Sequence, residues 1–214
     1  MASSPSDPYS EFYYSVHFDG ELIQTLVTGS CLCVDRWISD IYYLYRHDIA
    51  DDGLVVGLDC KSLPSSIAGI THPIAVMQLC VNDRCLIFQI MYADAMPIEL
   101  VRFLNDERIT FAGAAAKENA EKLKRDYGLR VACAVDVADM AALIYDDHEF
   151  RGMGLLEMAF TLLGEKMKKR SLSDWDNRFL TYSHVEYACV HAYMSYFLGM
   201  FILSFDDEEE TKRR

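Results

Sequence analysis

Hydrophobic and polar positions follow two periods along the chain, and these periods predict its strands and helices. Residues 11–27 alternate apolar and polar side chains around an Asp-Gly turn signal, which predicts a β-hairpin. Apolar residues then recur at helical spacing from Asp35, a candidate N-cap, to His47. Residues 54–62 form a run that is too apolar for a surface strand. We expect a buried central strand there, with Asp59 near its end.

The second part of the chain adds further strands and helices. Apolar runs at residues 74–81 and 85–90 are joined by an Asn-Asp turn and predict an antiparallel meander with the strand at residues 54–62. The other predicted elements are strands at residues 109–112 and 131–135 and helices at residues 97–103, 117–127, 136–145, 154–163 and 184–203. This order predicts an α/β protein with a ribonuclease-H-like mixed sheet, an antiparallel meander plus parallel strands, flanked by helices.

The length of 214 residues is enough for one ordinary domain with a full core. We expect a flexible N-terminus at residues 1–10 and a single domain at residues 11–204, whose N-terminal hairpin and helix occupy residues 11–50. A run of five acidic residues predicts a charged disordered tail at residues 205–214. The apolar stretch at residues 184–203 approaches the length of a membrane span. One glutamate and two histidines interrupt it, which favours a buried core helix over membrane insertion.

The formal charge of −13 disfavours tight binding to DNA or RNA, because non-specific affinity for nucleic acid comes chiefly from Lys and Arg. Two clusters of basic residues could still form local patches, and we interpret both as solvated charge. The clusters are Lys117, Lys122, Lys124 and Arg125, and Lys166, Lys168, Lys169 and Arg170. The charge therefore favours a protein partner over nucleic acid.

Seven cysteines lie scattered through apolar segments, without the paired spacing of a zinc site. This pattern indicates buried thiols in a reducing compartment. Residues 1–10 contain no apolar segment of the kind that a signal peptide needs. We therefore expect a cytoplasmic or nuclear protein.

Four groups of residues carry a resemblance to a known family. They are Val55-Val56-Gly57-Leu58-Asp59; Met77-Gln78-Leu79-Cys80 with Cys85-Leu86-Ile87-Phe88; Lys122-Leu123-Lys124-Arg125-Asp126-Tyr127-Gly128-Leu129; and Ser173-Asp174-Trp175 followed by Tyr187-Ala188-Cys189. Together they resemble the 3′–5′ exonuclease domain of the Werner-syndrome type, and in particular its small stand-alone plant members. The resemblance spans roughly residues 12–204, and the combination is specific although each piece is weak.

This resemblance implies a catalytic site of four carboxylates, which bind two divalent ions, Mg²⁺ or Mn²⁺, and a tyrosine that orients the attacking water. By position, the first aspartate of the family matches Asp59 and the tyrosine matches Tyr187. The three remaining acidic positions fall on Lys61, Asn119 and His191. A site of formal charge −4 would therefore carry a charge of about zero, because Asp59 and Lys61 cancel.

Two cations held close together need several oxygen ligands, and three substitutions remove most of them. We therefore expect no metal cofactor, and we expect Lys61 to lie close to Asp59 and supply the positive charge of a metal. The predicted function is that of a pseudo-exonuclease, a binding or regulatory module that binds a protein partner or itself, or that occupies nucleic acid without cutting it. The alternative is a weakly active metal-dependent 3′–5′ exonuclease that works through Asp59 and Tyr187.

Other readings of these residues are weaker. Glu118 could replace Asn119 as a ligand only if its helix shifted, since one residue is a rotation of about 100° on a helix. His191 with Asp59 could bind a softer metal such as zinc, but a lone histidine on an apolar helix is more often a core residue. Cys60 could be a nucleophile only if it were exposed and activated. Asp136 and Asp174 are better interpreted as cap or turn residues than as catalysts.

Overall fold

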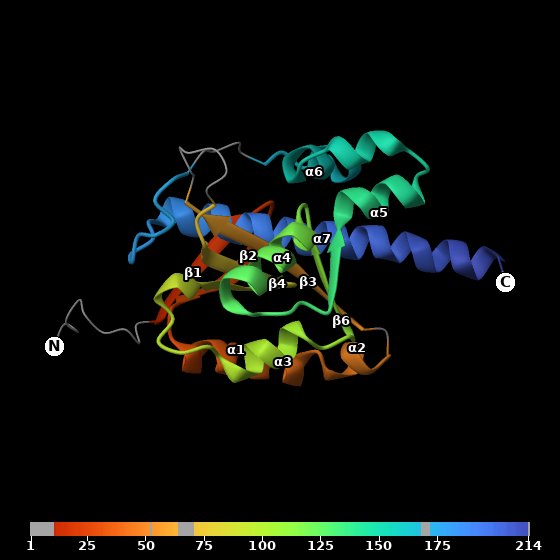
Figure 1. The fold of residues 1–214 in the computed structure, drawn as a ribbon. Helices are drawn as coiled ribbons and strands as arrows, with labels where there is room; N and C mark the ends of the chain where they lie inside the picture. Colours follow the sequence, from red (N-terminus) through yellow and green to blue (C-terminus); the bar gives the residue numbers. More distant parts are fainter. Residues whose placement is uncertain (1–10, 52, 64–70, 168–171, 214) are drawn as a thin grey trace.

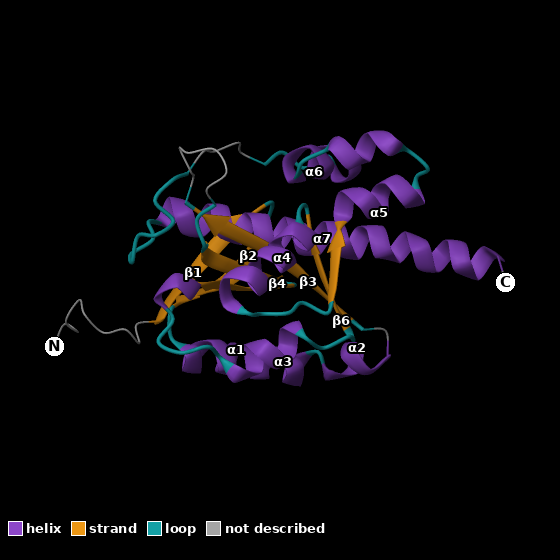
Figure 2. Ribbon diagram, in the orientation of Figure 1, coloured by secondary structure: helices purple, strands orange, loops and turns teal. Residues whose placement is uncertain are grey.

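A mixed β-sheet organises the structure (Figures 1 and 2). The computed structural model describes residues 11–51, 53–63, 71–167 and 172–213, and within these residues seven strands form one sheet in the order β1-β2-β5-β4-β3-β6-β7. The strands are β1 (Glu11–Phe18), β2 (Glu21–Thr28), β3 (Leu54–Ser62), β4 (Ile74–Val81), β5 (Arg84–Phe88), β6 (Ile109–Gly113) and β7 (Cys133–Asp136).

The strand pairing confirms the predicted mixed sheet. β1 and β2 form an antiparallel hairpin, and β3, β4 and β5 form the antiparallel meander. The pairs β2–β5, β3–β6 and β6–β7 are parallel. β3 lies between β4 and β6 and is covered on both faces, which explains its continuous apolar sequence.

Helices cover both faces of the sheet. They are α1 (Cys31–Leu44), α2 (Arg46–Asp51), α3 (Ile98–Leu104), α4 (Ala116–Tyr127), α5 (Val137–Ile144), α6 (Leu155–Leu163) and α7 (Tyr182–Arg213), with short 3₁₀ turns η1 (Ile90–Tyr92) and η2 (His148–Gly152). One core cluster joins the sheet to α1, α3 and α4. A second cluster joins the sheet to α7, and a third joins α7 to α5 and α6. Figure 1 shows α1 and α3 below the sheet and α5 and α6 beside the long α7.

The long helix α7 crosses β3 at very close range. A Cβ placed on Gly57 would overlap the carbonyl oxygen of Ala192 and lie 2.6 Å from the amide nitrogen of Tyr196. Residues 182–204 are long and apolar enough for a membrane span, but half of the most apolar window is buried within the structure. The contacts of α7 with β3, β4 and β6 are those of a core helix, as the sequence predicts.

Three local expectations differ from the structure. The first helix begins at Cys31 with Ser30 as N-cap. Asp35 lies inside that helix, where its Oδ1 accepts a hydrogen bond from the backbone N–H of Glu99 at the start of α3 (2.9 Å). Asp136 precedes α5, but its side chain does not cap that helix. It accepts a hydrogen bond from the backbone N–H of Lys117 instead (3.2 Å).

The third difference concerns the acidic C-terminal segment. We predicted a disordered tail at residues 205–214, whereas α7 continues through the acidic run to Arg213. Glutamate, lysine and arginine are good helix formers, and basic residues at a helix C-terminus complement its dipole. The predicted flexible N-terminus at residues 1–10 lies outside the described residues. The turn predicted at Asp174 is present, and its carbonyl accepts a hydrogen bond from the N–H of Asn177 (3.0 Å).

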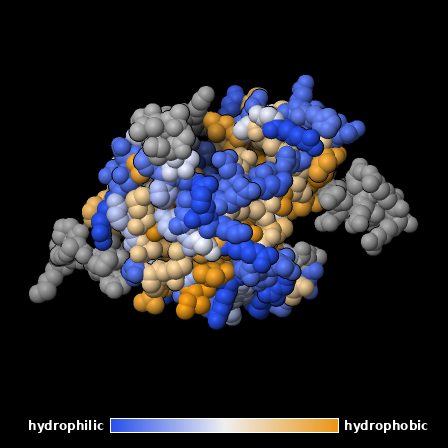
Figure 3. Space-filling model, viewed as in Figure 1, coloured by the Kyte–Doolittle hydropathy of each residue, from blue (hydrophilic) through white to orange (hydrophobic). Residues whose placement is uncertain are grey.

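Hydrophilic side chains dominate the surface seen in Figure 3, in keeping with the formal charge of −13. Apolar side chains gather at the lower edge of this view, over α1 and α3. The large apolar residues exposed on these two helices are Leu32, Tyr43, Leu44, Ile98 and Val101.

Candidate functional site

The candidate site forms where α7 crosses the end of β3. Asp59 and Lys61 are two residues apart on β3 and therefore share one face of the sheet. Tyr187 and His191 are one helical turn apart on α7, and their rings stack with centroids 4.0 Å apart. Lys61 Nζ lies 2.5 Å from Asp59 Oδ2 and 5.1 Å from the centre of the Tyr187 ring, and His191 Nδ1 lies 3.5 Å from the same Oδ2. The expected contact between Lys61 and Asp59 is thus present.

The carboxylate of Asp59 is held by a cation and by its own strand. Oδ1 accepts a hydrogen bond from the backbone N–H of Cys60 (2.8 Å). Oδ2 is buried and accepts no aligned hydrogen bond, so its charge is balanced by ionic contact with the ammonium group. Burial on its own raises the pKa of Asp59, but Lys61 and then His191 outweigh it and lower the pKa to about 2. The carboxylate is therefore ionised at neutral pH.

These residues do not fit a pair of divalent cations. Oδ2 of Asp59 is the oxygen that faces the middle of the cluster, and the Lys61 ammonium lies against it. Among the described residues, no group of three or more His, Cys, Asp or Glu side chains could hold a metal ion. A hard cation prefers several oxygen ligands, and this cluster offers one carboxylate beside a fixed positive charge.

Asn119 and Glu118 lie on α4, a helix that contacts β3. Asn119 is half-buried, and no hydrogen bond or ion pair of the described residues joins its side chain to Asp59, Lys61 or His191. Glu118 is exposed. Among the described residues, direct contacts therefore join four of the five positions that the resemblance singles out.

Cys60 is not activated as a nucleophile. Burial, and then the neighbouring Asp59 carboxylate, raise the pKa of its thiol well above the ordinary value. The thiol is therefore protonated at neutral pH, which agrees with the expectation that Cys60 is not a nucleophile.

Gln78 is a neighbour of the site that the sequence analysis did not single out. It lies directly opposite Asp59 in the β3–β4 register and is fully buried. Its amide nitrogen donates to the carbonyl of Val76 (3.3 Å), whereas its Oε1 has no hydrogen-bond partner. The sequence signal that could have identified Gln78 is that it is the single polar residue in the apolar run of β4.

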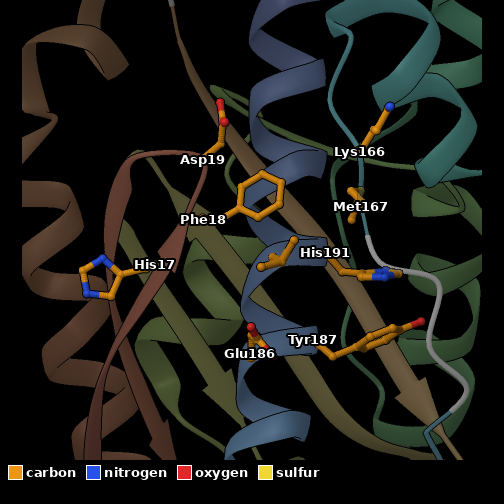
Figure 4. Close-up of a pocket in the computed structure, with 9 residues that line it drawn as sticks. His17, Phe18, Asp19, Lys166, Met167, Glu186, Tyr187 and His191 are labelled. Carbon is orange, nitrogen blue, oxygen red and sulfur yellow. The ribbon is translucent and has the colours of Figure 1, made fainter.

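A pocket of about 240 Å³ lies beside the cluster. It is lined by the β1–β2 turn, by Lys166 and Met167, and by α7. Figure 4 shows the rings of Tyr187 and His191 projecting from the same side of α7, one above the other, with Met167 and Lys166 above them on the segment that follows α6. Nε2 of His191 is buried without a hydrogen-bond partner. Among the described residues, neither Asp59 nor Lys61 lines this pocket; the two rings that contact them do.

The basic residues of α4 are largely neutralised by acids. Lys117 Nζ lies 2.7 Å from Asp139 Oδ2, and Lys122 Nζ lies 3.0 Å from Asp126 Oδ2. Arg125 also contacts Asp126, at 3.3 Å. In the second basic cluster only Lys166 lies within the described residues. Three of the four basic side chains of the α4 cluster are thus paired with acids, which leaves the exposed Lys124 as a single charge rather than a patch.

Comparisons with known proteins agree with this fold. A family model described as 3′–5′ exonuclease matches residues 41–198. Exonuclease 3′-5′ domain-containing protein 2 of Drosophila melanogaster is 28% identical over 145 residues, which make up 66% of this chain and 24% of that protein. The bifunctional 3′-5′ exonuclease/ATP-dependent helicase WRN of Mus musculus is 31% identical over 144 residues, 66% of this chain and 10% of that protein. The chain thus spans a quarter or less of the length of these relatives.

Among solved structures, Brucella melitensis NrnC aligns with a TM-score of 0.60 and 19% identity, covering 76% of this chain and 78% of that chain. This similarity supports the ribonuclease-H-like fold. The match of the family model to most of the chain confirms the resemblance to a 3′–5′ exonuclease domain. The chain belongs to the 3′–5′ exonuclease family.

Proposed function

We propose that this chain is a pseudo-exonuclease, which keeps the fold of the family but binds its partners without cutting nucleic acid. The observation that supports this proposal is the 2.5 Å contact between Lys61 Nζ and Asp59 Oδ2. The lysine ammonium lies against the one carboxylate that the resemblance assigns to metal binding. It therefore competes directly with any cation for that oxygen.

The electrostatic cost of metal binding supports the same conclusion. Two unit charges about 4 Å apart interact by about 4 kcal/mol at an effective dielectric of about 20, and a divalent ion doubles this energy. Lys61 would therefore repel a divalent ion at Asp59 by about 8 kcal/mol. His191 and Asn119 carry no negative charge to offset this repulsion. The ammonium would have to leave its carboxylate before a cation could bind.

As a binding module, the chain would take a protein partner or a second copy rather than a nucleic acid. The formal charge of −13 repels a phosphate backbone. Three of the four Lys and Arg side chains of α4 that could offset this repulsion, those of Lys117, Lys122 and Arg125, are paired with Asp139 and Asp126. Exposed apolar side chains on α1 and α3 offer surface to a protein.

A nuclease assay tests this proposal on 3′-labelled single-stranded DNA, recessed DNA and RNA with Mg²⁺ or Mn²⁺. It compares the natural protein with the triple variant Lys61→Glu/Asn119→Asp/His191→Asp, which restores the family's carboxylates. We expect no cutting by the natural protein and metal-dependent cutting by the triple variant. The control adds Asp59→Asn to the triple variant, and this addition should abolish cutting.

Cutting by the natural protein would contradict the proposal if EDTA and Asp59→Ala both abolished it. That outcome would favour a weak metal-dependent exonuclease that works through Asp59 and Tyr187. A pull-down partner whose binding survives Asp59→Ala would support the binding role.

A further inference from the structure

The two edges of the sheet differ in how well they are protected against pairing with another chain. β7, at one edge, has only four residues. β1, at the other edge, has eight residues that pair with β2 in unbroken register, without a bulge. β1 also contains no proline, lysine or arginine. Short length, bulges, proline and basic side chains are usual features that protect an edge strand, and β1 has none of these; its charged protection is limited to Glu11 at its first position.

The turn between β1 and β2 determines which residues of β1 face outward. Asp19 and Gly20 both have positive φ, +47° and +82°, as a type I′ turn requires. Such a turn bonds the carbonyl of Phe18 to the N–H of Glu21, and the bonded pairs then alternate along the hairpin. The even-numbered residues therefore bond to β2. The N–H and C=O groups of the odd-numbered residues point away from the sheet.

These outward groups are uncovered in the described part of the chain. No backbone hydrogen bond of a turn, loop or cap involves a residue of β1. The side chains of the odd-numbered residues, Glu11, Tyr13, Ser15 and His17, are all exposed. Tyr13 is 67% exposed, and the even-numbered Phe12 is 40% exposed.

We propose that β1 pairs with β1 of a second copy of this chain, antiparallel and about a two-fold axis at Tyr14. The proposal goes beyond the proposed function, since it holds whether or not the site cuts nucleic acid. In this register the outward groups of Tyr13 bond to those of Ser15 of the second copy, and those of Glu11 bond to those of His17 of the second copy. The two sheets become one continuous sheet.

The side chains on β1 are complementary in this register. The Glu11 carboxylate lies opposite an imidazole, a group of suitable chemistry to donate a hydrogen bond to it or to balance its charge. On the other face, Phe12 lies opposite Val16, which is fully buried in the cluster under α7. The pairing would therefore extend an existing apolar face over a phenylalanine that is now exposed.

The two-fold symmetry is the reason for choosing a second copy over an unrelated peptide. Each contact occurs twice, because one strand supplies both sides of an isologous interface. A foreign peptide adding to this edge would need a matching histidine and valine at the same spacing.

The test uses two charge-bearing variants of the full chain, Tyr13→Lys/Ser15→Lys and Tyr13→Glu/Ser15→Glu. Positions 13 and 15 face each other across the proposed axis, so each variant places like charges directly opposite. Both side chains are exposed in the single chain, so the fold should tolerate the changes. Sedimentation equilibrium should give twice the 24.4 kDa chain mass for the natural protein and the single-chain mass for each variant alone. A mixture of the two variants should restore a dimer that contains one of each.

The dissociation constant should rise at least about tenfold in each variant alone. A natural protein that stays monomeric at concentrations of about 100 μM would overturn the proposal, and so would a dimer that survives in both variants. Monomeric variants that fail to form a mixed dimer would also overturn it, because the antiparallel register would then be wrong. Circular dichroism of each variant, matched to the natural protein, shows that the loss of dimer is not a loss of fold.

Discussion

At the scale of single residues, the pairing of Lys61 with Asp59, which we propose blocks metal binding, is also a structural contact. Their side chains are 16% and 17% exposed, so removing one charge leaves the other nearly buried. We expect Lys61→Met to lower the free energy of unfolding by about 2 kcal/mol at pH 7, as measured by urea denaturation. The double variant Asp59→Asn/Lys61→Met removes both charges and should recover most of that loss.

The matched control for this prediction is Lys117→Met. Lys117 also contacts a carboxylate at short range, 2.7 Å from Asp139 Oδ2, but both side chains are about half exposed. Its removal should cost less than about 0.5 kcal/mol, as is usual for surface ion pairs. Equal losses in the two lysine variants would mean that burial of the Lys61–Asp59 pair has no energetic consequence.

At the scale of elements, the close approach of α7 to β3 brings His191 to Asp59. Gly57 permits this approach, because a Cβ there would overlap the carbonyl oxygen of Ala192, the residue after His191. We expect Gly57→Ala to destabilise the protein by about 3 kcal/mol, since the helix and the strand must move apart. Thermal unfolding measures the loss.

Gly152→Ala is the control for Gly57→Ala, since a Cβ at Gly152 has no neighbour within 4 Å. This substitution should leave the melting temperature almost unchanged. A natural melting temperature in Gly57→Ala would show that the contact between α7 and β3 is looser than the structure indicates.

The elements themselves were largely predictable, because the periods of 2 and 3.6 residues are local properties of the sequence. The hairpin, the meander and helices α3 to α6 lie where those periods place them. Asp35 and Asp136 were predicted to cap the helices that follow them in the sequence, because a local sequence pattern can indicate only a cap that is adjacent to its helix. Instead, the Asp35 side chain accepts a hydrogen bond from a backbone N–H in the first turn of α3, and the Asp136 side chain accepts one from the first turn of α4. Such contacts between distant segments depend on tertiary packing.

At the scale of the whole molecule, the site shows what a sequence can and cannot predict. The contact between Lys61 and Asp59 follows from their spacing on one strand, so the sequence was sufficient to expect it. The approach of Tyr187 and His191 to that pair joins segments more than a hundred residues apart, and only the family resemblance predicted it. Gln78 was missed because its position opposite Asp59 depends on the register between two strands.

The most direct test of the central claim is a titration of Mn²⁺ followed by electron paramagnetic resonance, which detects metal binding without requiring catalysis. It compares the natural protein and the triple variant Lys61→Glu/Asn119→Asp/His191→Asp, each with and without Asp59→Asn. We predict that the triple variant binds Mn²⁺ through Asp59. The natural protein should bind none at this site at concentrations that saturate the triple variant. Mn²⁺ binding by the natural protein that Asp59→Asn abolishes would contradict the account, because the Lys61 ammonium would then not exclude a metal.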